Sequence, residues 1–300
     1  MIRSARGRGA ILDYVQPQDL IRDALEAVAR KSRLGIGDLL IRGFLAGGLL
    51  AYSTSLVLIV LSQGLPPVAG AILFPVGFVI LVLLGLELAT GNFALFPAGV
   101  AGGRASWSGM LRNWSWVYLG NLAGSLCYAG LFYLAVTNCG ASASGAIGDL
   151  AKQIALRKTV SYAALGFRGW ETAFVKGLLC NWMVTLGAVL ALASRSTLGK
   201  VAAMWLPIMT FFAHGYEHSI VNMFVIPAGR MFGAQLSVAQ WWLWNQLPVT
   251  LGNIVSGALL TGLALYWTHA PATPPAFDSR IEAEEAAPVN VLRDLANAGS

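Results

Sequence analysis

The sequence predicts an all-α membrane protein with six transmembrane helices, and three observations lead to that fold class. Of the 300 residues, 56% are hydrophobic and only 11% are charged, against roughly 25% charged in a soluble domain. A helix needs about 20 apolar residues to cross a hydrocarbon core of about 30 Å. Six stretches reach that length, at about 38–62, 67–89, 113–136, 171–193, 201–227 and 246–268.

The third observation is an internal repeat. “RGFLAG” at 42–47 matches “KGLLCN” at 176–181, “ELATGN” at 87–92 matches “EHSIVN” at 217–222, and “YLGNLAGSL” at 118–126 matches “TLGNIVSGAL” at 250–259. Each half carries three spans, and an odd number forces the second half to insert upside down. This predicts an inverted 3+3 repeat, with the transported species near the midplane between corresponding interrupted helices.

The second and fifth spans are the interrupted ones. Both “ELATGNFALFPAG” and “HGYEHSIVNMFVIPAG” place polar residues and glycine, then a proline, inside an apolar run. Backbone groups freed at such a break need protein or cavity-water partners, because lipid offers none. We expect the polar side chains at each break, among them Asn92 and Asn222, to supply part of this support.

Three regions follow from the composition. Residues 1–34 are polar and basic without a cleavable signal, and 17–33 has the spacing of an amphipathic helix or of a solvated lead-in. Residues 35–269 form the six-helix domain. Residues 270–300 are rich in Pro, Ala and acidic residues, which is typical of a flexible cytosolic tail.

The basic residues set the expected orientation. More of them flank the spans on the side of the N-terminus, and four of the five on the opposite side, Lys152, Arg157, Lys158 and Arg168, lie in one loop. The expectation is a multi-pass protein of the inner (plasma) membrane with both termini cytoplasmic. Anionic membrane lipid explains the net charge of +6, so no nucleic-acid partner is expected. The three cysteines have no metal-ligand spacing, and we expect neither metal nor cofactor.

Glu87 and Glu217 occupy equivalent places in the repeat. A charged side chain at the bilayer centre costs about 2.5–3.5 kcal/mol, so each suggests a function. Each also lies where a helix breaks, and the alternative role is to hold the break in shape. The repeat equates neither His218 with another histidine nor Asn181 with another asparagine, since Asn181 matches Gly47. Either a packed core role or a place in a midplane pathway fits His218, and the asymmetry favours the pathway for both.

Other classes of protein remain open at this point. “HGYEH” has the H-x-x-E-H pattern of a zinc protease, which makes a membrane metalloenzyme using His214, Glu217 and His218 one alternative. Such a site needs a downstream carboxylate ligand and a water-filled cavity, and the apolar run that follows offers neither, so we do not expect an enzyme. A neutral-solute channel of aquaporin type is the other alternative, although neither break has an Asn-Pro-Ala signature. A passive scaffold would need no paired helix breaks.

The blocks “ELATGN”, “NWSWVYLGNLAGSL”, “KGLLCNWMV”, “GYEHSIVNMFVIPAG” and “PVTLGNIVSGALL” resemble the formate/nitrite transporter family over roughly residues 25–268. Members of that family carry monovalent anions such as formate, nitrite, hydrosulfide or lactate. The resemblance implies an aquaporin-like fold, a homopentamer with one pathway in each protomer, and a cytoplasmic N-terminus.

The resemblance also implies roles for single residues. Thr90 would meet the central histidine, His218, which Glu217 would brace, and Asn181 would line the pathway. The apolar constrictions would be formed by Phe74 with Phe211 on one side and by Phe78 with Leu88 on the other. Lys31 matches a basic residue of the inner vestibule. This sequence departs from the pattern at Ala89, where formate channels usually have phenylalanine, and at Leu165, where an outer lysine is expected and Arg168 is the candidate substitute.

The hypothesis from the sequence is a pH-dependent channel for small monovalent anions of weak acids. Basic vestibules concentrate the anion, the apolar rings exclude water, and the polar centre receives the permeant. A bare anion is costly there and the neutral acid is not, which implies that a proton is a second partner. That proton comes either from His218 or from bulk water.

Overall fold

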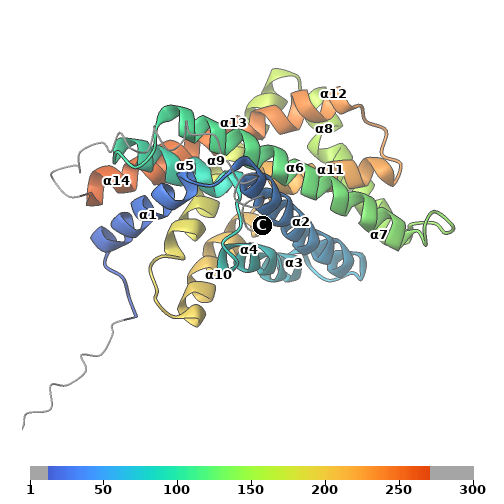
Figure 1. The fold of residues 1–300 in the computed structure, drawn as a ribbon. Coiled ribbons are helices and arrows are strands. Elements are labelled where there is room, and N and C mark those ends of the chain that lie inside the picture. Colours follow the sequence, from blue (N-terminus) through green and yellow to red (C-terminus); the bar gives the residue numbers. More distant parts are fainter. Residues whose placement is uncertain (1–12, 271–300) are drawn as a thin grey trace, which may run out of the picture.

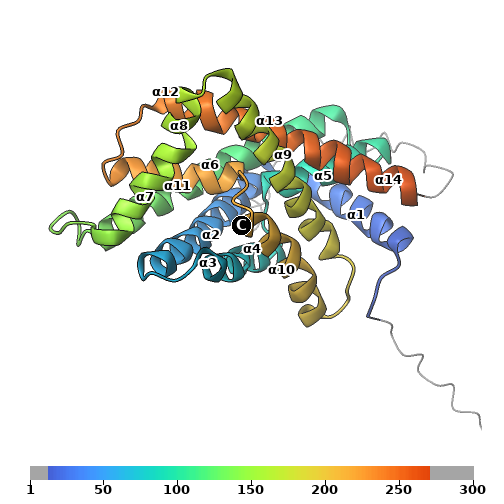
Figure 2. The same ribbon diagram turned by 180° about the vertical axis from the view of Figure 1, so that it is seen from behind.

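The computed structural model describes residues 13–270, and helices make up its regular structure (Figures 1 and 2). Within this range, the only β-type pairing is an isolated antiparallel bridge between Tyr14 and Ser194. The all-α fold class is therefore confirmed. Part of the predicted N-terminal region and almost all of the predicted tail, residues 1–12 and 271–300, lie outside the described residues.

Among residues 13–270, four helices are long and apolar enough to cross a membrane. They are α2 (Ile36–Ser62), α6 (Trp107–Val136), α9 (Phe167–Leu190) and the composite helix Val238–His269. The last comprises α12 (Val238–Trp241), the π-helical η1 (Trp242–Gln246), α13 (Leu247–Val255), the π-helical η2 (Ser256–Leu263) and α14 (Ala264–His269). The second and fifth predicted spans contain shorter apolar helices, Pro67–Leu83 and Thr197–Ala213.

Those two helices are short because the chain leaves the helical conformation at residues 84–88 and 214–218, at the start of the two polar stretches, whereas Pro97 and Pro227 lie inside the helices that follow. The first comprises α3 (Pro67–Leu73) and α4 (Pro75–Leu83), and after the non-helical residues 84–88 the chain continues as α5 (Ala89–Ala101). The second, α10 (Thr197–Ala213), is followed by residues 214–218 and then α11 (Ser219–Met231). Gly85 and Gly215 have φ of +64° and +66°, a conformation that glycine adopts without steric cost. Each break thus begins with a left-handed turn.

In each half of the chain, glycine residues allow two long helices to approach each other closely. A Cβ at Gly120 would lie 2.8 Å from the Leu40 carbonyl oxygen, so α6 approaches the backbone of α2 at this point. In the second half, a Cβ at Gly177 would lie 2.7 Å from the Val249 carbonyl oxygen, which places α9 equally close to α13. Small residues permit such close helix pairs in membranes, where apolar burial between helices gives little driving force.

The remaining helices lie at the two ends of the molecule. α1 (Pro17–Ser32) buries Leu20, Leu25 and Val28 against the helix bundle, so it is an amphipathic helix rather than a solvated lead-in. The stretch treated as a loop from the sequence instead folds into α7 (Gly145–Lys158) and the short α8 (Val160–Ala164). α7 packs against α11 (Figure 1). As a result, α7 brings its basic residues to the second helix break.

Candidate functional site

Two asparagines hold the two helix breaks by the same set of hydrogen bonds. The Asn121 Nδ2 atom donates to the carbonyl oxygens of Gly43 and Glu87, and its Oδ1 accepts from the Ala89 backbone amide, at 2.8–3.0 Å. Asn253 likewise donates to the carbonyl oxygens of Gly177 (2.7 Å) and Glu217 (3.2 Å) and accepts from the Ser219 amide (3.0 Å). These bonds satisfy backbone groups that the interrupted helices leave unpaired.

The two glutamates form matched ion pairs beside the breaks. Glu87 accepts from Lys31 at 2.5 Å and from Asn92 at 2.7 Å. Glu217 accepts from Lys158 at 2.7 Å and from Asn222 at 2.8 Å. Asn92 and Asn222 each also donate to a further asparagine, Asn113 and Asn245 respectively, at 2.8 Å. Both carboxylates are almost completely buried and fully engaged with protein donors, which favours the structural role for them.

The carboxylate of Glu217 does not brace the ring of His218. Its Oε1 accepts from the Tyr162 hydroxyl at 2.9 Å, and its Oε2 accepts from Lys158, Asn222 and Asn245. Neither ring nitrogen of His218 has a carboxylate partner among residues 13–270. The reason is that adjacent residues in extended backbone point in opposite directions, and His218 has φ of −109° and ψ of 120°.

His218 caps helix α11 with its own side chain. The ring atom Nδ1 accepts from the backbone amides of Ile220 and Val221, both at 3.2 Å. An atom that accepts these bonds carries no proton, so the neutral ring carries its proton on Nε2. Nε2 lies 3.1 Å from the Thr90 hydroxyl oxygen and donates to it. The Thr90 hydroxyl hydrogen then remains available to a third group.

Asn181 also lies beside Thr90. Its Nδ2 donates to the carbonyl oxygens of Thr90, at 3.1 Å, and of Asn253, at 2.7 Å, and so connects α5 to the last turn before η2. Its Oδ1 is buried without a hydrogen-bond partner in the described part of the chain. Buried polar atoms are rarely unpaired, and such an atom offers an acceptor at this point.

Two cavities approach the Thr90–His218 pair from different sides. One has a volume of about 520 Å³ and is lined by Phe78, Leu88 and Gly91 and by residues of α1; we call it the α1 cavity. The other has a volume of about 600 Å³ and is lined by Phe211 and His218 and by residues of α7; we call it the α7 cavity. The α1 cavity reaches Leu88 and Gly91, on either side of Thr90 in the chain, and the α7 cavity reaches His218. The hydrogen-bonded pair of Thr90 and His218 therefore lies between the two cavities.

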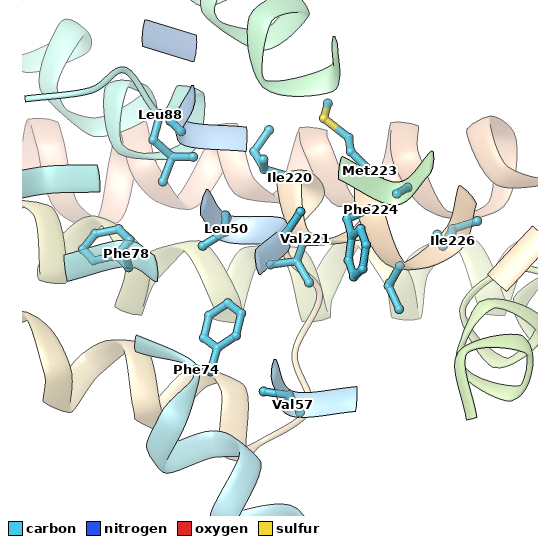
Figure 3. Close-up of a cluster of buried hydrophobic side chains, with 14 of the residues drawn as sticks. Leu50, Val57, Phe74, Phe78, Leu88, Ile220, Val221, Met223, Phe224 and Ile226 are labelled. Carbon is cyan, nitrogen blue, oxygen red and sulfur yellow. The ribbon is translucent and has the colours of Figure 1, made fainter. Parts of the chain in front are cut away.

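Buried aromatic rings lie where the α7 cavity meets the central pair. The Phe74 ring contacts Phe211 edge to face at 5.7 Å between centroids, and the Phe211 ring lies 5.8 Å from that of His218. Phe74 also stacks on Phe212 at 4.0 Å between centroids. This contact was not predicted from the sequence, although Phe212 directly follows Phe211. Phe74 and Phe78 enter one buried cluster with Leu50 and Leu88 (Figure 3).

Each cavity is lined by cations, but Arg168 is not among them. The α1 cavity is lined by Arg30, Lys31 and Arg42. The α7 cavity is lined by Arg157 and Lys158. Arg168 is exposed near the start of α9, outside the cavity lining. The helical fold of α7, which the sequence analysis treated as a loop, is what brings the other two cations to the cavity.

The residues of the zinc-protease pattern do not form a metal site in the structure. His214 is exposed, with Nδ1 2.7 Å from the Thr210 carbonyl oxygen and its ring stacked on Tyr216. Both nitrogens of His218 are engaged by α11 and Thr90. Within residues 13–270 no group of three His, Cys, Asp or Glu side chains is placed to hold a metal ion.

Comparisons with known proteins agree on one family. The sequence profile of the formate/nitrite transporters matches residues 18–267. A probable formate transporter of Methanothermobacter thermautotrophicus is 36% identical, over 85% of this chain and 96% of its own. The formate channel FocA of Escherichia coli (strain K12) is 34% identical, over 68% of this chain and 74% of its own.

Two solved structures have a similar fold. One is described as an FNT family ion channel, with a TM-score of 0.73 and 28% identity over 84% of this chain and 99% of its own. The other is described as a pentameric formate channel with formate bound, with a TM-score of 0.63 and 28% identity over 78% of this chain and 96% of its own.

Proposed function

Because the chain belongs to the formate/nitrite transporter family, we propose that it is a pH-dependent membrane channel for formate, nitrite or a similar small monovalent anion of a weak acid. Its relatives and structural neighbours are transporters and channels rather than enzymes. The observation that carries the proposal is the Thr90–His218 pair, buried between two cavities that are lined by cations.

We infer that the chain forms an aquaporin-like inverted repeat of three and three spans, interrupted in the second and fifth. The support is the residue-for-residue agreement between two hydrogen-bond networks. Asn121 and Asn253 bond to equivalent backbone groups, and Glu87 and Glu217 accept from an equivalent lysine and asparagine. Thr90, His218 and Asn181 break this agreement and mark the centre of the pathway.

Homopentamer assembly, with one pathway in each protomer, is part of the proposal. A structural neighbour is described as pentameric, and this chain covers 96% of it. Both termini are placed in the cytoplasm of a cell bounded by an inner (plasma) membrane, because basic residues flank the spans more often on that side. The α1 cavity is then the inner vestibule and the α7 cavity the outer one.

The direction of the central hydrogen bonds suits an anion. Helix α11 fixes Nδ1 of His218 as an acceptor, Nε2 donates to Thr90, and the Thr90 hydroxyl donates to the permeant. The cavity-lining cations outside the two ion pairs, Arg30, Arg42 and Arg157, raise the local anion concentration. Phe74 with Phe211, and Phe78 with Leu88, keep the path between the vestibules apolar. Crossing that path as the neutral acid avoids the desolvation of a bare charge.

Of the two proton sources, the geometry favours the solvent. Direct donation by His218 starts from an imidazolium, which carries a proton on both ring nitrogens. Protonation of Nδ1 would break its bonds to Ile220 and Val221 and place a positive charge at the positive end of a helix. In this account His218 transmits a hydrogen bond to the permeant, and bulk water supplies the proton as the anion leaves the vestibule.

A flux assay tests the proposal. Purified protein in liposomes is mixed rapidly with formate, nitrite, hydrosulfide, lactate or acetate, with and without a pH gradient. We expect uptake of the smaller anions to exceed that of protein-free liposomes and to rise when the external pH is lowered. Transport of glycerol or urea at the same rate as formate would instead favour a neutral-solute channel.

A further inference from the structure

We propose that the α7 cavity is a binding site for an amphipathic monoanion, meaning one carboxylate or sulfonate on a short alkyl chain or a single ring, and that its occupation blocks the pathway. The binding site is independent of the proposed function, whereas the block rests on it. The proposal follows from the size of the cavity, its walls and one cation in its lining.

The cavity is larger than an anion of three non-hydrogen atoms requires. Its volume of about 600 Å³ falls within the roughly 300–1,000 Å³ of pockets that enclose whole organic ligands. Its walls are largely aliphatic and come from α2 and α7, including Val57, Leu58, Leu61 and Ile154. Formate has no apolar surface to place against them. A chain of several methylenes, or one ring, does.

Arg157 is suited to hold the anionic group. It lines the cavity, it is exposed, and no carboxylate of residues 13–270 pairs with it. The neighbouring Lys158 is already committed to Glu217 at 2.7 Å. Gln153 lies one helical turn before Arg157 and lines the same cavity, so its amide can donate beside the guanidinium. A planar guanidinium binds carboxylate and sulfonate oxygens in pairs.

The floor of the site is connected to the constriction. Phe211 and Phe212 both line the cavity, and Phe74 contacts both rings. A ligand with its anion at Arg157 and its apolar part on these rings lies over the entrance to the central pair. Because the Phe74 and Phe211 rings are in edge-to-face contact, a ligand that carries a ring or a chain of several methylenes stays on the cavity side and obstructs smaller anions without being transported.

Sulfonates test this site because they stay ionised and do not cross lipid as neutral acids. Binding of methanesulfonate, butanesulfonate and benzenesulfonate to the purified full-length chain is measured by titration calorimetry, and inhibition of formate uptake is measured in liposomes. Inhibition is expressed relative to the uninhibited flux of each variant. We expect affinity to rise by about fourfold for each added methylene, and benzenesulfonate to bind and inhibit.

Arg157→Gln removes the anion contact and should weaken both binding and inhibition by about tenfold or more. Ile154→Ser should reduce the gain from methanesulfonate to butanesulfonate. Arg168→Gln is the matched control, because it removes an exposed arginine near the same end of the molecule but outside the cavity. It should leave benzenesulfonate affinity unchanged.

The proposal is overturned if benzenesulfonate neither binds nor inhibits, if affinity does not depend on chain length, or if Arg168→Gln weakens binding as much as Arg157→Gln. Failure of the proposed function gives a different pattern. In that case formate uptake is absent from the start, while the calorimetric dependence on Arg157 and chain length still decides whether the site exists.

Discussion

The Nε2 atom of His218 lies 3.1 Å from the hydroxyl oxygen of Thr90, and the Nδ1 atom of the same ring caps helix α11. The two residues come from different halves of the chain, one at each helix break. The capping bonds determine which ring nitrogen carries the proton, and that in turn determines that Thr90 accepts from the ring and can donate to a permeant. The first backbone amides of α11 therefore determine the direction of the hydrogen bond between His218 and Thr90.

Replacement of Thr90 tests whether its hydroxyl contacts the permeant. Thr90→Val preserves the shape of the side chain and removes the hydroxyl, leaving the His218 Nε2–H without its partner. Formate flux should fall by about tenfold, as expected when one hydrogen bond to the permeant is lost and the buried Nε2–H is left unpaired. Thr90→Ser keeps the hydroxyl and is the control. Equal flux in the Val and Ser variants, at equal protein incorporation, contradicts this role.

Replacement of His218 separates capping from transport. Asparagine is a good N-cap residue, so His218→Asn should preserve α11 while its shorter side chain no longer reaches Thr90. We expect formate flux to fall strongly with little change in melting temperature. His218→Phe should lose flux as well as the cap, at a cost of about 1 kcal/mol. If His218→Phe retains wild-type, pH-dependent flux, the residue has no role in transport.

The two buried glutamates should differ in their effect on stability. Glu217 accepts from four side chains, Glu87 from two. Glu217→Gln leaves Lys158 without a carboxylate and should destabilise the protein by about 3 kcal/mol, more than Glu87→Gln. Thermal unfolding in detergent provides the comparison. The double variant Lys158→Met with Glu217→Gln should recover part of the loss, and an equal or larger loss would exclude the ion pair as the cause.

A pH-dependent contact joins the N-terminal segment to the loop between α9 and α10. The pKa of Asp13 is lowered, first because the Ser194 hydroxyl donates to it and then because the Ser196 amide does. A lowered pKa means that the contact is fully formed above the unfolded value, about 3.9, and is lost as pH falls through the lower folded value. Hydrogen exchange of the Ser196 amide, corrected for its intrinsic rate, should therefore lose protection only below about pH 4.

Asp13→Ala is the control for this contact. The variant should show reduced protection of the Ser196 amide that no longer changes with pH between about 2 and 6, because the acceptor at 2.7 Å is absent and only the longer bond to the Ser194 hydroxyl oxygen, at 3.1 Å, remains. Protection that still depends on pH in Asp13→Ala, or that is lost near neutral pH in the unaltered chain, would assign the pH dependence to another group.

The helix breaks and their glutamates could be predicted from the sequence because polar residues inside apolar runs have few explanations. The repeat then indicated which residues have an equivalent in the other half of the chain. Glu217 has one, in Glu87, whereas His218 matches no second histidine, and this difference predicted different roles for the two neighbours. The family resemblance predicted the contact between Thr90 and His218, which the structure contains. The capping role of His218 was not predicted, because it depends on the backbone angles of the break rather than on spacing.

The cations of the α7 cavity were also missed. Lys158 lies 127 residues after Lys31, close to the offsets of 130–134 between the repeated motifs, so the repeat did contain a signal for it. The charged segment around it was predicted to be a loop, but it forms the helix α7, which packs on α11. A sequence pattern gives the spacing of residues along one helix. It does not show against which distant part of the chain that helix packs, and so it could not place α7 beside the second helix break.

The central claim is that the anion crosses the apolar centre together with a proton. The measurement is formate uptake into liposomes in which a potassium gradient with valinomycin sets the membrane potential independently of the pH gradient. The account predicts that uptake follows the pH gradient, with one proton for each formate, and does not change with membrane potential. Uptake that follows the membrane potential at equal internal and external pH would show conduction of the bare anion and contradict the account.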